Sequence, residues 1–347
     1  MNLADLVALV LWLGVSAYAV LGGADFGSGF WDLTAGGAQR GARPRALVDL
    51  AIGSVWEANH VWLIFCLVVL WTAFPPAFVA IMTTLFVPLM IAVIGILLRG
   101  SGFAFRHVTR EFGARRAFGV AFAVSSIVTP FAMGTIAGAI ASGRVPLDGS
   151  GDQMTSWINP TSVFAGVLAV ATCSFLAATF LVDEARHRDD AGLVEYFRRR
   201  GIGAGIATGV LALVGIVVLR GDAEWLFDRL VGRALPLLIL SGLGGLGAMW
   251  ALHRLRPALA RVLAVVAVGA VVWGWGVAQY DYMLPTTLTI EEAAAPSGTM
   301  WALVGVVVLA VLIVGPALWL LLSLSQQNRL ETEDLSEVAA ENVPHGR

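Results

Sequence analysis

Apolar residues run along this chain in long unbroken stretches, and polar residues are confined to the short intervals between them. A helix needs about 20 mostly apolar residues to cross a bilayer. The runs are continuous rather than alternating, which favours helices over barrel strands because a helix satisfies its own backbone hydrogen bonds. The pattern predicts an all-α integral membrane protein, a helical bundle of nine spans over residues 3–22, 52–74, 77–98, 117–141, 161–182, 202–219, 234–252, 258–278 and 299–323.

The composition excludes a water-soluble protein. Of the 347 residues, 58% are apolar and only 13% charged, and the mean hydropathy is +0.81. In soluble domains about a quarter of the residues are charged. As a soluble protein, this chain would have nowhere to bury so much apolar surface. The glycine-rich segment 241–247 falls inside a predicted span, where glycines serve helix packing rather than a nucleotide loop. We expect no nucleic-acid partner.

The arginines predict an orientation, because positive residues gather on the cytoplasmic side of a membrane. The chain has 22 arginines and no lysine. The loops after the first, third, fifth and seventh spans, together with the C-terminal tail, hold 18 of these 22, and the other side holds Arg144, Arg220, Arg229 and Arg233. We therefore predict an outside N-terminus and a cytoplasmic C-terminus, with one polytopic domain over residues 1–325 and a polar, acidic cytoplasmic tail over 326–347.

The densest group of polar side chains inside a span lies at the start of the second predicted helix. Glu57 and His60 are three residues apart and therefore share a helix face, with Trp56, Asn59 and Trp62 beside them. A polar group in a membrane needs a partner or a function. Two interpretations stay open: a buried carboxylate that holds helices together, paired with the histidine or an arginine, and a carboxylate that carries protons.

An intramembrane histidine also raises the question of haem. A transmembrane b-type haem takes two axial ligands from facing helices. The other histidines, at positions 107, 187, 253 and 345, fall in loops or at the ends of predicted spans. We therefore expect this chain to ligate no haem and no metal ion.

Two more clusters of charged residues are predicted on the cytoplasmic side. Asp25 lies in a glycine-rich stretch, residues 22–32, that is typical of a helix exit. The alternative is that Asp25 stands at a proton entrance leading towards Glu57. Arg99 and Arg106 end the third predicted span, where an arginine either sets the topology or pairs with one of these two carboxylates.

Together these segments resemble subunit II of the cytochrome bd-type quinol oxidases. The resemblance covers most of the chain, and its most specific part is the tryptophan-bracketed motif. The family form of that motif reads Trp-Asp-Gly-Asn-x-Val-Trp, so Glu57 here replaces an aspartate and Ala58 a glycine. The segments that carry the resemblance are Gly23-Ala24-Asp25-Phe26-Gly27, Trp56-Glu57-Ala58-Asn59-His60-Val61-Trp62, Arg99-Gly100-Ser101-Gly102-Phe103-Ala104-Phe105-Arg106 and Gln279-Tyr280-Asp281-Tyr282-Met283-Leu284-Pro285.

The resemblance implies a subunit of a terminal oxidase in the bacterial cytoplasmic (inner) membrane, not catalytic alone. Such a complex oxidises quinol and reduces dioxygen to water. Subunit I, the expected partner, carries the haems, either b-type with d-type or b-type only, and the quinol site. Surrounding lipids, a structural quinone in this subunit and a small single-span accessory subunit are compatible with the family.

The resemblance also implies roles for the residues singled out above. Asp25, Glu57 and His60 are expected along a cytoplasmic proton route. Trp56 and Trp62 are expected near an oxygen path or the subunit interface. The supporting polar residues are Asn59, Arg99 and Arg106.

A proton-coupled secondary transporter is the main alternative. Transporters bring broken helices and binding sites together near the middle of the membrane. The polar residues here gather near one side and the predicted helices look unbroken, which disfavours that class. A self-contained haem protein is disfavoured by the positions of the histidines, and a scaffold subunit in which Glu57 is only structural stays open.

Overall fold

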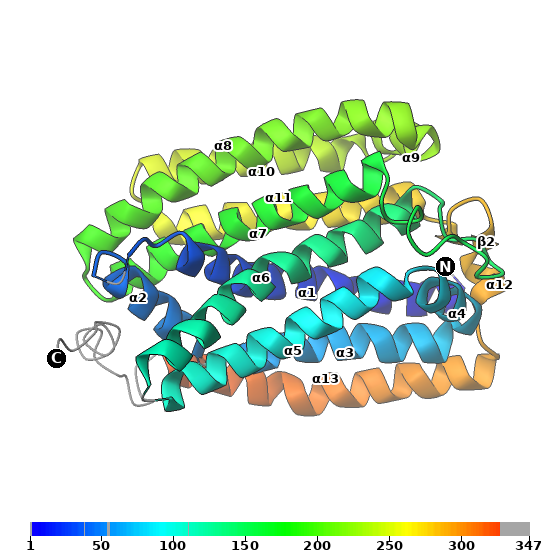
Figure 1. Ribbon diagram of the computed structural model, residues 1–347. Helices are drawn as coiled ribbons and strands as arrows, with labels where there is room; N and C mark the ends of the chain where they lie inside the picture. The colour runs from blue at the N-terminus through cyan, green and yellow to red at the C-terminus, as the bar shows by residue number, and fades with distance from the viewer. Residues whose placement is uncertain (1, 38, 54–55, 110, 327–347) are drawn as a thin grey trace.

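The computed structural model describes residues 2–37, 39–53, 56–109 and 111–326, without the side chains of residues 52, 53, 56–58, 107, 112, 314, 318, 319 and 321–326. The predicted acidic tail therefore lies, from residue 327 onwards, outside the described residues. The long helices run side by side in one elongated bundle (Figure 1). The predicted all-α, helical-bundle membrane fold is confirmed.

Within these residues the chain forms nine long helices, four short ones and a small hairpin. The long helices are α1 (Leu3–Leu33), α3 (Trp56–Ala73), α5 (Phe86–Val108), α6 (Phe112–Ala141), α7 (Pro160–His187), α8 (Ala191–Asp222), α10 (Leu235–His253), α11 (Pro257–Gln279) and α13 (Ser297–Gln326). The short elements are α2 (Ala42–Gly53), α4 (Pro75–Thr84), α9 (Glu224–Val231), α12 (Ile290–Ala293) and the antiparallel strands β1 (Tyr282–Leu284) and β2 (Leu288–Thr289). Eight of the described helices are each long and apolar enough to cross a membrane, and a bent pair brings the number to as many as nine.

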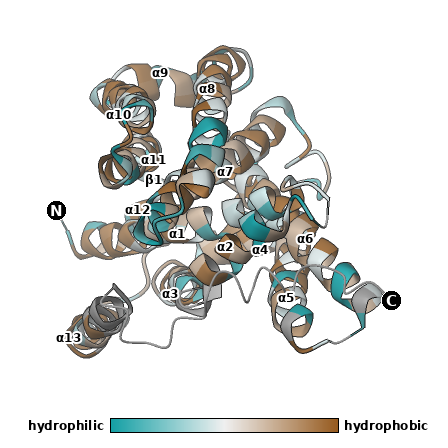
Figure 2. Cartoon of the chain, turned by 90° about the vertical axis from the view of Figure 1, so that its left-hand side faces the viewer, coloured by the Kyte–Doolittle hydropathy of each residue, from teal (hydrophilic) through white to brown (hydrophobic). Residues whose placement is uncertain are grey.

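Helix α1 lies at the centre of the bundle and packs against α3, α6, α7, α11 and α13 (Figure 2). Helix α5 packs on α6. On the opposite side of the bundle, α7 packs on α8 and α11, and α10 packs on both α8 and α11. Helix α13 touches α1 and α3 and otherwise presents an exposed apolar surface that includes Trp301, Val311 and Leu312. We call the end of the bundle where α1, α5, α7, α10 and α13 finish, together with α2, the arginine-rich end.

The predicted helix exit after residue 22 is wrong, because α1 continues through the glycine-rich stretch to Leu33. The glycines let α1 press closely against α7: a Cβ on Gly27 would lie 1.8 Å from the carbonyl oxygen of Cys173. Such close approach is the usual role of small residues between membrane helices. Trp31 adds a hydrogen bond to α7, donating from Nε1 to the carbonyl oxygen of Ser174 at 2.8 Å.

The predicted third span, residues 77–98, is also wrong in its bounds. Helices α3 and α4 meet at a bend of 119°, and α4 ends at Thr84, so that the spanning helix is Phe86–Arg106. Pro88 explains the interruption, because it has no N–H for the carbonyl of Thr84, and its ring would clash with that carbonyl in a continuous helix. Helix α4 therefore lies across the end of the bundle away from the arginine-rich end (Figure 1).

Candidate functional site

A buried ion pair links α1 to α5. Arg99 Nη2 lies 2.6 Å from Asp25 Oδ1, and the two side chains are 1% and 3% exposed. The same guanidinium donates from Nη2 to the backbone carbonyl of Asp25 at 3.1 Å and from Nη1 to Ser126 Oγ of α6 at 3.0 Å. Asp25 is eight residues from the end of α1, about 12 Å along the helix axis. Arg99 therefore binds Asp25, one of the two carboxylates considered for it, and the side chain of the other, Glu57, lies outside the described residues.

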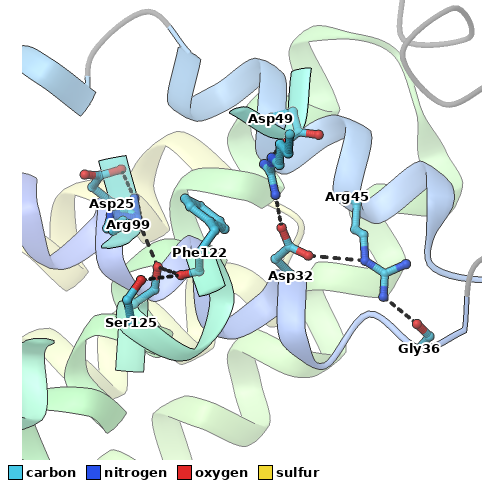
Figure 3. A network of polar contacts seen from close by, with 10 residues as sticks. Asp25, Asp32, Gly36, Arg45, Asp49, Arg99, Phe122 and Ser125 are labelled. Atoms are coloured by element: carbon cyan, nitrogen blue, oxygen red, sulfur yellow. Dashed lines mark hydrogen bonds and ion pairs between the residues drawn. The ribbon is translucent and has the colours of Figure 1, made fainter. Parts of the chain in front are cut away.

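A second group of charges lies closer to the arginine-rich end (Figure 3). Arg106 of α5 binds Asp32 Oδ2 of α1 at 2.6 Å and also pairs with Asp49 of α2. Arg45 Nε lies 3.2 Å from the other oxygen of Asp32. Buried charges are stable in a protein only when they are paired. This group therefore fastens α2 onto the ends of α1 and α5.

The ring of Phe122 on α6 lies between the two buried arginines. The guanidinium carbon of Arg99 is 4.7 Å from the ring centroid, and that of Arg106 is 4.4 Å away. A cation over an aromatic face is attracted by the ring quadrupole. Asp25 and Asp32 are seven residues apart on α1, as the two arginines are on α5, and seven residues make two helix turns. Two ion pairs thus follow each other along the bundle, with an aromatic ring between their cations.

The tryptophan-bracketed motif forms the first turns of α3. Asn59 is buried and donates from Nδ2 to the carbonyl oxygen of Leu21 at 3.4 Å. The ring of His60 meets Tyr18 and Phe26 edge-on, with centroid distances of 6.3 and 6.0 Å. Phe26 follows Asp25 in the chain, and its ring centroid lies 5.0 Å from the guanidinium carbon of Arg99. His60 therefore borders the Asp25–Arg99 ion pair.

Three other residues of the motif are less informative. Trp62 is half-buried and packs edge-on against Phe65 at 6.2 Å. Trp56 and Glu57 belong to the first turn of α3 by their backbone, and their side chains lie outside the described residues. The structure therefore brings together Asp25, Arg99 and the surroundings of His60, and it leaves the position of the Glu57 carboxylate a prediction.

The described residues do not fit a bis-histidine haem held by this chain. His60 would need a second ligand from a facing helix. The helices that pack most closely on α3 are α1, α4 and α13, and none of these contains a histidine. His187 lies at the end of α7, where Nδ1 is 2.8 Å from the carbonyl oxygen of Asp183. Within the described residues there is also no cluster of three side chains suited to a metal ion.

Sequence reasoning missed Asp32, Asp49 and Phe122 as members of this site. A signal for the first was present, since the seven-residue spacing of two aspartates in one apolar helix is matched by two arginines in another. Asp49 and Phe122 carry no comparable signal, because their roles depend on where α2 and α6 pack.

The fold and the site together define a class of protein: a polytopic, all-α membrane protein that keeps paired carboxylates and arginines inside its bundle. Ionisable groups in such positions are characteristic of ion and proton pathways. Comparison with known proteins is more specific. A model of the cytochrome bd terminal oxidase subunit II family matches residues 3–324, and this chain belongs to that family. The chain is therefore a subunit of a quinol oxidase complex.

Individual relatives agree with this assignment. The chain is 20% identical over 318 residues to the putative cytochrome bd menaquinol oxidase subunit II of Bacillus subtilis, covering 88% of this chain and 91% of the relative. It is 25% identical over 190 residues to the cytochrome bd-I ubiquinol oxidase subunit 2 of Escherichia coli, covering 51% and 48%. The solved bd oxidase structure from Geobacillus thermodenitrificans contains a chain of the same fold, with a TM-score of 0.77, 24% identity and coverage of 94% and 100%. The transporter alternative is not favoured.

Proposed function

We propose that this chain is the subunit of the oxidase that ligates no haem, and that it lines a proton route from the arginine-rich end towards the haems of subunit I. The observation that carries the proposal is the buried ion pair of Asp25 and Arg99. Reduction of one dioxygen to two waters consumes four protons. A carboxylate inside an apolar bundle is costly, and a proton route gives it a function.

The geometry of Asp25 suits this role. Its Oδ1 is held by Arg99, whereas its buried Oδ2 has no hydrogen-bond partner among the described residues. One oxygen is thus fixed in place by a permanent cation, and the other remains able to accept a hydrogen bond. Glu57 and His60, one turn apart at the start of α3, would continue the route on the neighbouring helix.

The orientation follows the arginines. With the arginine-rich end in the cytoplasm of a bacterium and the start of α1 outside, the route would draw its protons from the cytoplasm. Proton uptake on that side and quinol oxidation on the other would then generate a membrane potential. Residues 326–347 would be a solvated cytoplasmic tail of the single domain.

The partner subunit would complete the site. The haems, b-type with d-type or b-type only, would be held by subunit I, because α1, α4 and α13 offer no histidine opposite His60. Trp56 and Trp62 would lie near the subunit interface or an oxygen path, and dioxygen, being apolar, can arrive through the lipid. A structural quinone and a small single-span accessory subunit remain compatible with this arrangement.

The partner assignment is tested by tagging this chain and purifying it in mild detergent with and without subunit I. Reduced-minus-oxidised spectra should contain haem bands only when subunit I is present. Haem bound to this chain alone would contradict the proposed division of roles.

The proton role is tested with Asp25→Asn in the assembled complex. We expect quinol-driven oxygen consumption to fall by about tenfold or more, with unchanged haem content, because a proton acceptor is lost. Asp183→Asn is the matched control, since Asp183 is also buried and paired with an arginine, Arg261, at 2.8 Å, but lies on α7. Asp25→Glu should restore part of the turnover. Normal turnover of Asp25→Asn would remove the proton role.

Glu57→Gln provides an independent measurement on α3. It should impair oxygen consumption while the complex and its haems stay intact. Normal turnover of Glu57→Gln would remove the proton role of Glu57, and normal turnover of both variants would leave this chain a scaffold subunit.

A further inference from the structure

A tyrosine on α1 lies between the two parts of the proposed route. Tyr18 precedes Asp25 by seven residues and therefore lies on the same face of α1, two turns further from the arginine-rich end. Gly22 lies between them, and a Cβ there would be 2.9 Å from Tyr18 Cε2. The aromatic ring thus extends along the helix over Gly22, in the direction of Asp25, in space that any larger side chain would fill.

Several polar atoms in this region are buried without a hydrogen-bond partner among the described residues. They are the hydroxyl oxygen of Tyr18, Oδ2 of Asp25 and Nε of Arg99. Tyr18 and Asp25 share one face of α1, and Arg99 is bound to Asp25 at 2.6 Å. Leaving a buried polar group without a hydrogen bond costs free energy. Groups of this kind in proteins normally bind ordered water, which needs two to four polar partners.

The region also lies where the apolar core is divided. Residues of α1 up to Val15 pack into one apolar cluster, and those from Val20 onwards pack into another. Tyr18 falls between the two clusters. A hydrated site here interrupts neither of them.

Tyr18 also contacts the other helix of the route. Its ring meets the His60 ring of α3 edge-on at 6.3 Å. The same residue therefore borders Asp25 along α1 and His60 across to α3.

We propose that Tyr18 is a relay residue of the proton route, and that its hydroxyl and Oδ2 of Asp25 bind ordered water connecting Asp25 to the His60 side of the bundle. This inference rests on the proposed function. A hydroxyl accepts one hydrogen bond while it donates another. A proton that arrives on its oxygen releases the original proton on the other side, so the tyrosine ends neutral and Asp25 keeps its bond to Arg99.

Tyr18→Phe tests the proposal because it removes the hydroxyl and keeps the ring. The matched control is Tyr196→Phe on α8, whose hydroxyl oxygen is also buried without a hydrogen-bond partner among the described residues and whose ring centroid lies 3.5 Å from the guanidinium carbon of Arg200. Both variants are purified as the complete oxidase complex. The first measurement is a high-resolution cryo-EM map, in which the unmodified protein should contain water density within hydrogen-bond distance of Tyr18 Oη and Asp25 Oδ2. That density should be lost or displaced in Tyr18→Phe.

The second measurement is oxygen consumption in H2O and in D2O. We expect Tyr18→Phe to lower turnover about fivefold to tenfold, less than loss of a direct proton donor because water can replace part of the path, and to increase the solvent isotope effect. Tyr196→Phe should change neither quantity. Absence of the water density, or normal turnover with an unchanged isotope effect in Tyr18→Phe, would overturn the inference. If Asp25→Asn is impaired while Tyr18→Phe is normal, this inference fails and the proposed function stands; if Asp25→Asn is normal, the proposed function itself fails.

Discussion

The guanidinium of Arg99 and the carboxylate of Asp25 meet at 2.6 Å, with both side chains at most 3% exposed. Bulk water does not reach either charge at that depth, so each depends on the other and on neighbouring hydrogen bonds. Taking two charges out of water is expensive, and a buried pair therefore contributes little net stability. Removing one member alone is far more damaging.

Arg99→Leu should accordingly lower the free energy of unfolding by about 3–5 kcal/mol, because it leaves the Asp25 carboxylate uncompensated. The double variant Asp25→Asn/Arg99→Leu should recover much of this loss while turnover stays low. Denaturation in detergent, followed by tryptophan fluorescence, measures the difference. Arg261→Leu is the control and should cost less, since Arg261 is 39% exposed. Equal instability of the single and double Arg99 variants would contradict the assignment.

Phe122→Leu tests the aromatic ring between the two arginines. The variant loses two cation–π contacts in addition to ring packing, and we expect a loss of about 3–5 kcal/mol of unfolding free energy. Phe118→Leu on the same helix is the matched control, because Phe118 packs on another ring, Phe105, at 5.4 Å. The control should lose less, measured by the same denaturation. Indistinguishable losses would mean that the guanidinium contacts contribute nothing measurable.

Arg106→Gln should release α2 from the bundle, because Arg106 joins Asp32 of α1 to Asp49 of α2. Amide hydrogen exchange over residues 42–53 should accelerate about tenfold or more, since each lost charge-assisted hydrogen bond is worth about 1.5–3 kcal/mol. Arg45→Gln, which removes a longer and partly exposed contact to Asp32 and a hydrogen bond to the carbonyl oxygen of Gly36, should have a smaller effect, because neither contact joins α2 to α5. Unchanged exchange in Arg106→Gln would show that α2 is held by its apolar contacts.

Gly27→Ala tests the close approach of α1 and α7. A methyl group there would overlap the carbonyl oxygen of Cys173, and overpacking of this kind costs about 1–3 kcal/mol or more. Gly203→Ala on α8 is the control: a Cβ there meets nothing within 4 Å, so the variant should be neutral or stabilised by up to about 1 kcal/mol. Thermal denaturation of the two variants decides the matter. Equal stability would contradict the packing described here.

The sequence predicted the helical class of the fold and most of its spans because each span carries its own apolar signal. The sequence-based predictions were wrong where hydropathy alone does not mark the end of a helix. The Gly22–Asp32 stretch mixes glycines and aromatic residues with two aspartates, and only contact with α7 reveals that the helix continues through it. Pro88 lies inside an equally apolar run, and its effect depends on the carbonyl of Thr84.

The arginines were informative for a similar reason. Most gather at one end of the described bundle, as the pattern predicted. Three of those at the other end have structural partners: Arg144 binds Asp222 at 2.7 Å, and Arg229 and Arg233 both donate to the backbone carbonyl of Tyr280, directly after α11. These contacts explain why three arginines lie at the end of the bundle that is otherwise poor in arginine.

The candidate site was predictable only in part. Buried charges in apolar helices identified Asp25, Arg99 and Arg106, since such residues are rare without a purpose. Their pairing depends on the packing of α1, α5 and α6, which the chain pattern does not contain. The contact between Tyr18 and His60 was beyond prediction for the same reason, because tyrosine is ordinary in membrane helices.

The equal spacing of the charges on α1 and α5 has a consequence for assembly. Asp25 with Arg99 and Asp32 with Arg106 are each 74 residues apart, so the two pairs share one offset between the helices. If α5 slid along α1 by two turns, Arg99 would meet Asp32, and Arg106 and Asp25 would each lose their α1–α5 partner. The slipped arrangement would leave two buried charges unpaired, whereas the native arrangement pairs all four. The two ion pairs therefore specify the register of α5 against α1 while the bundle assembles.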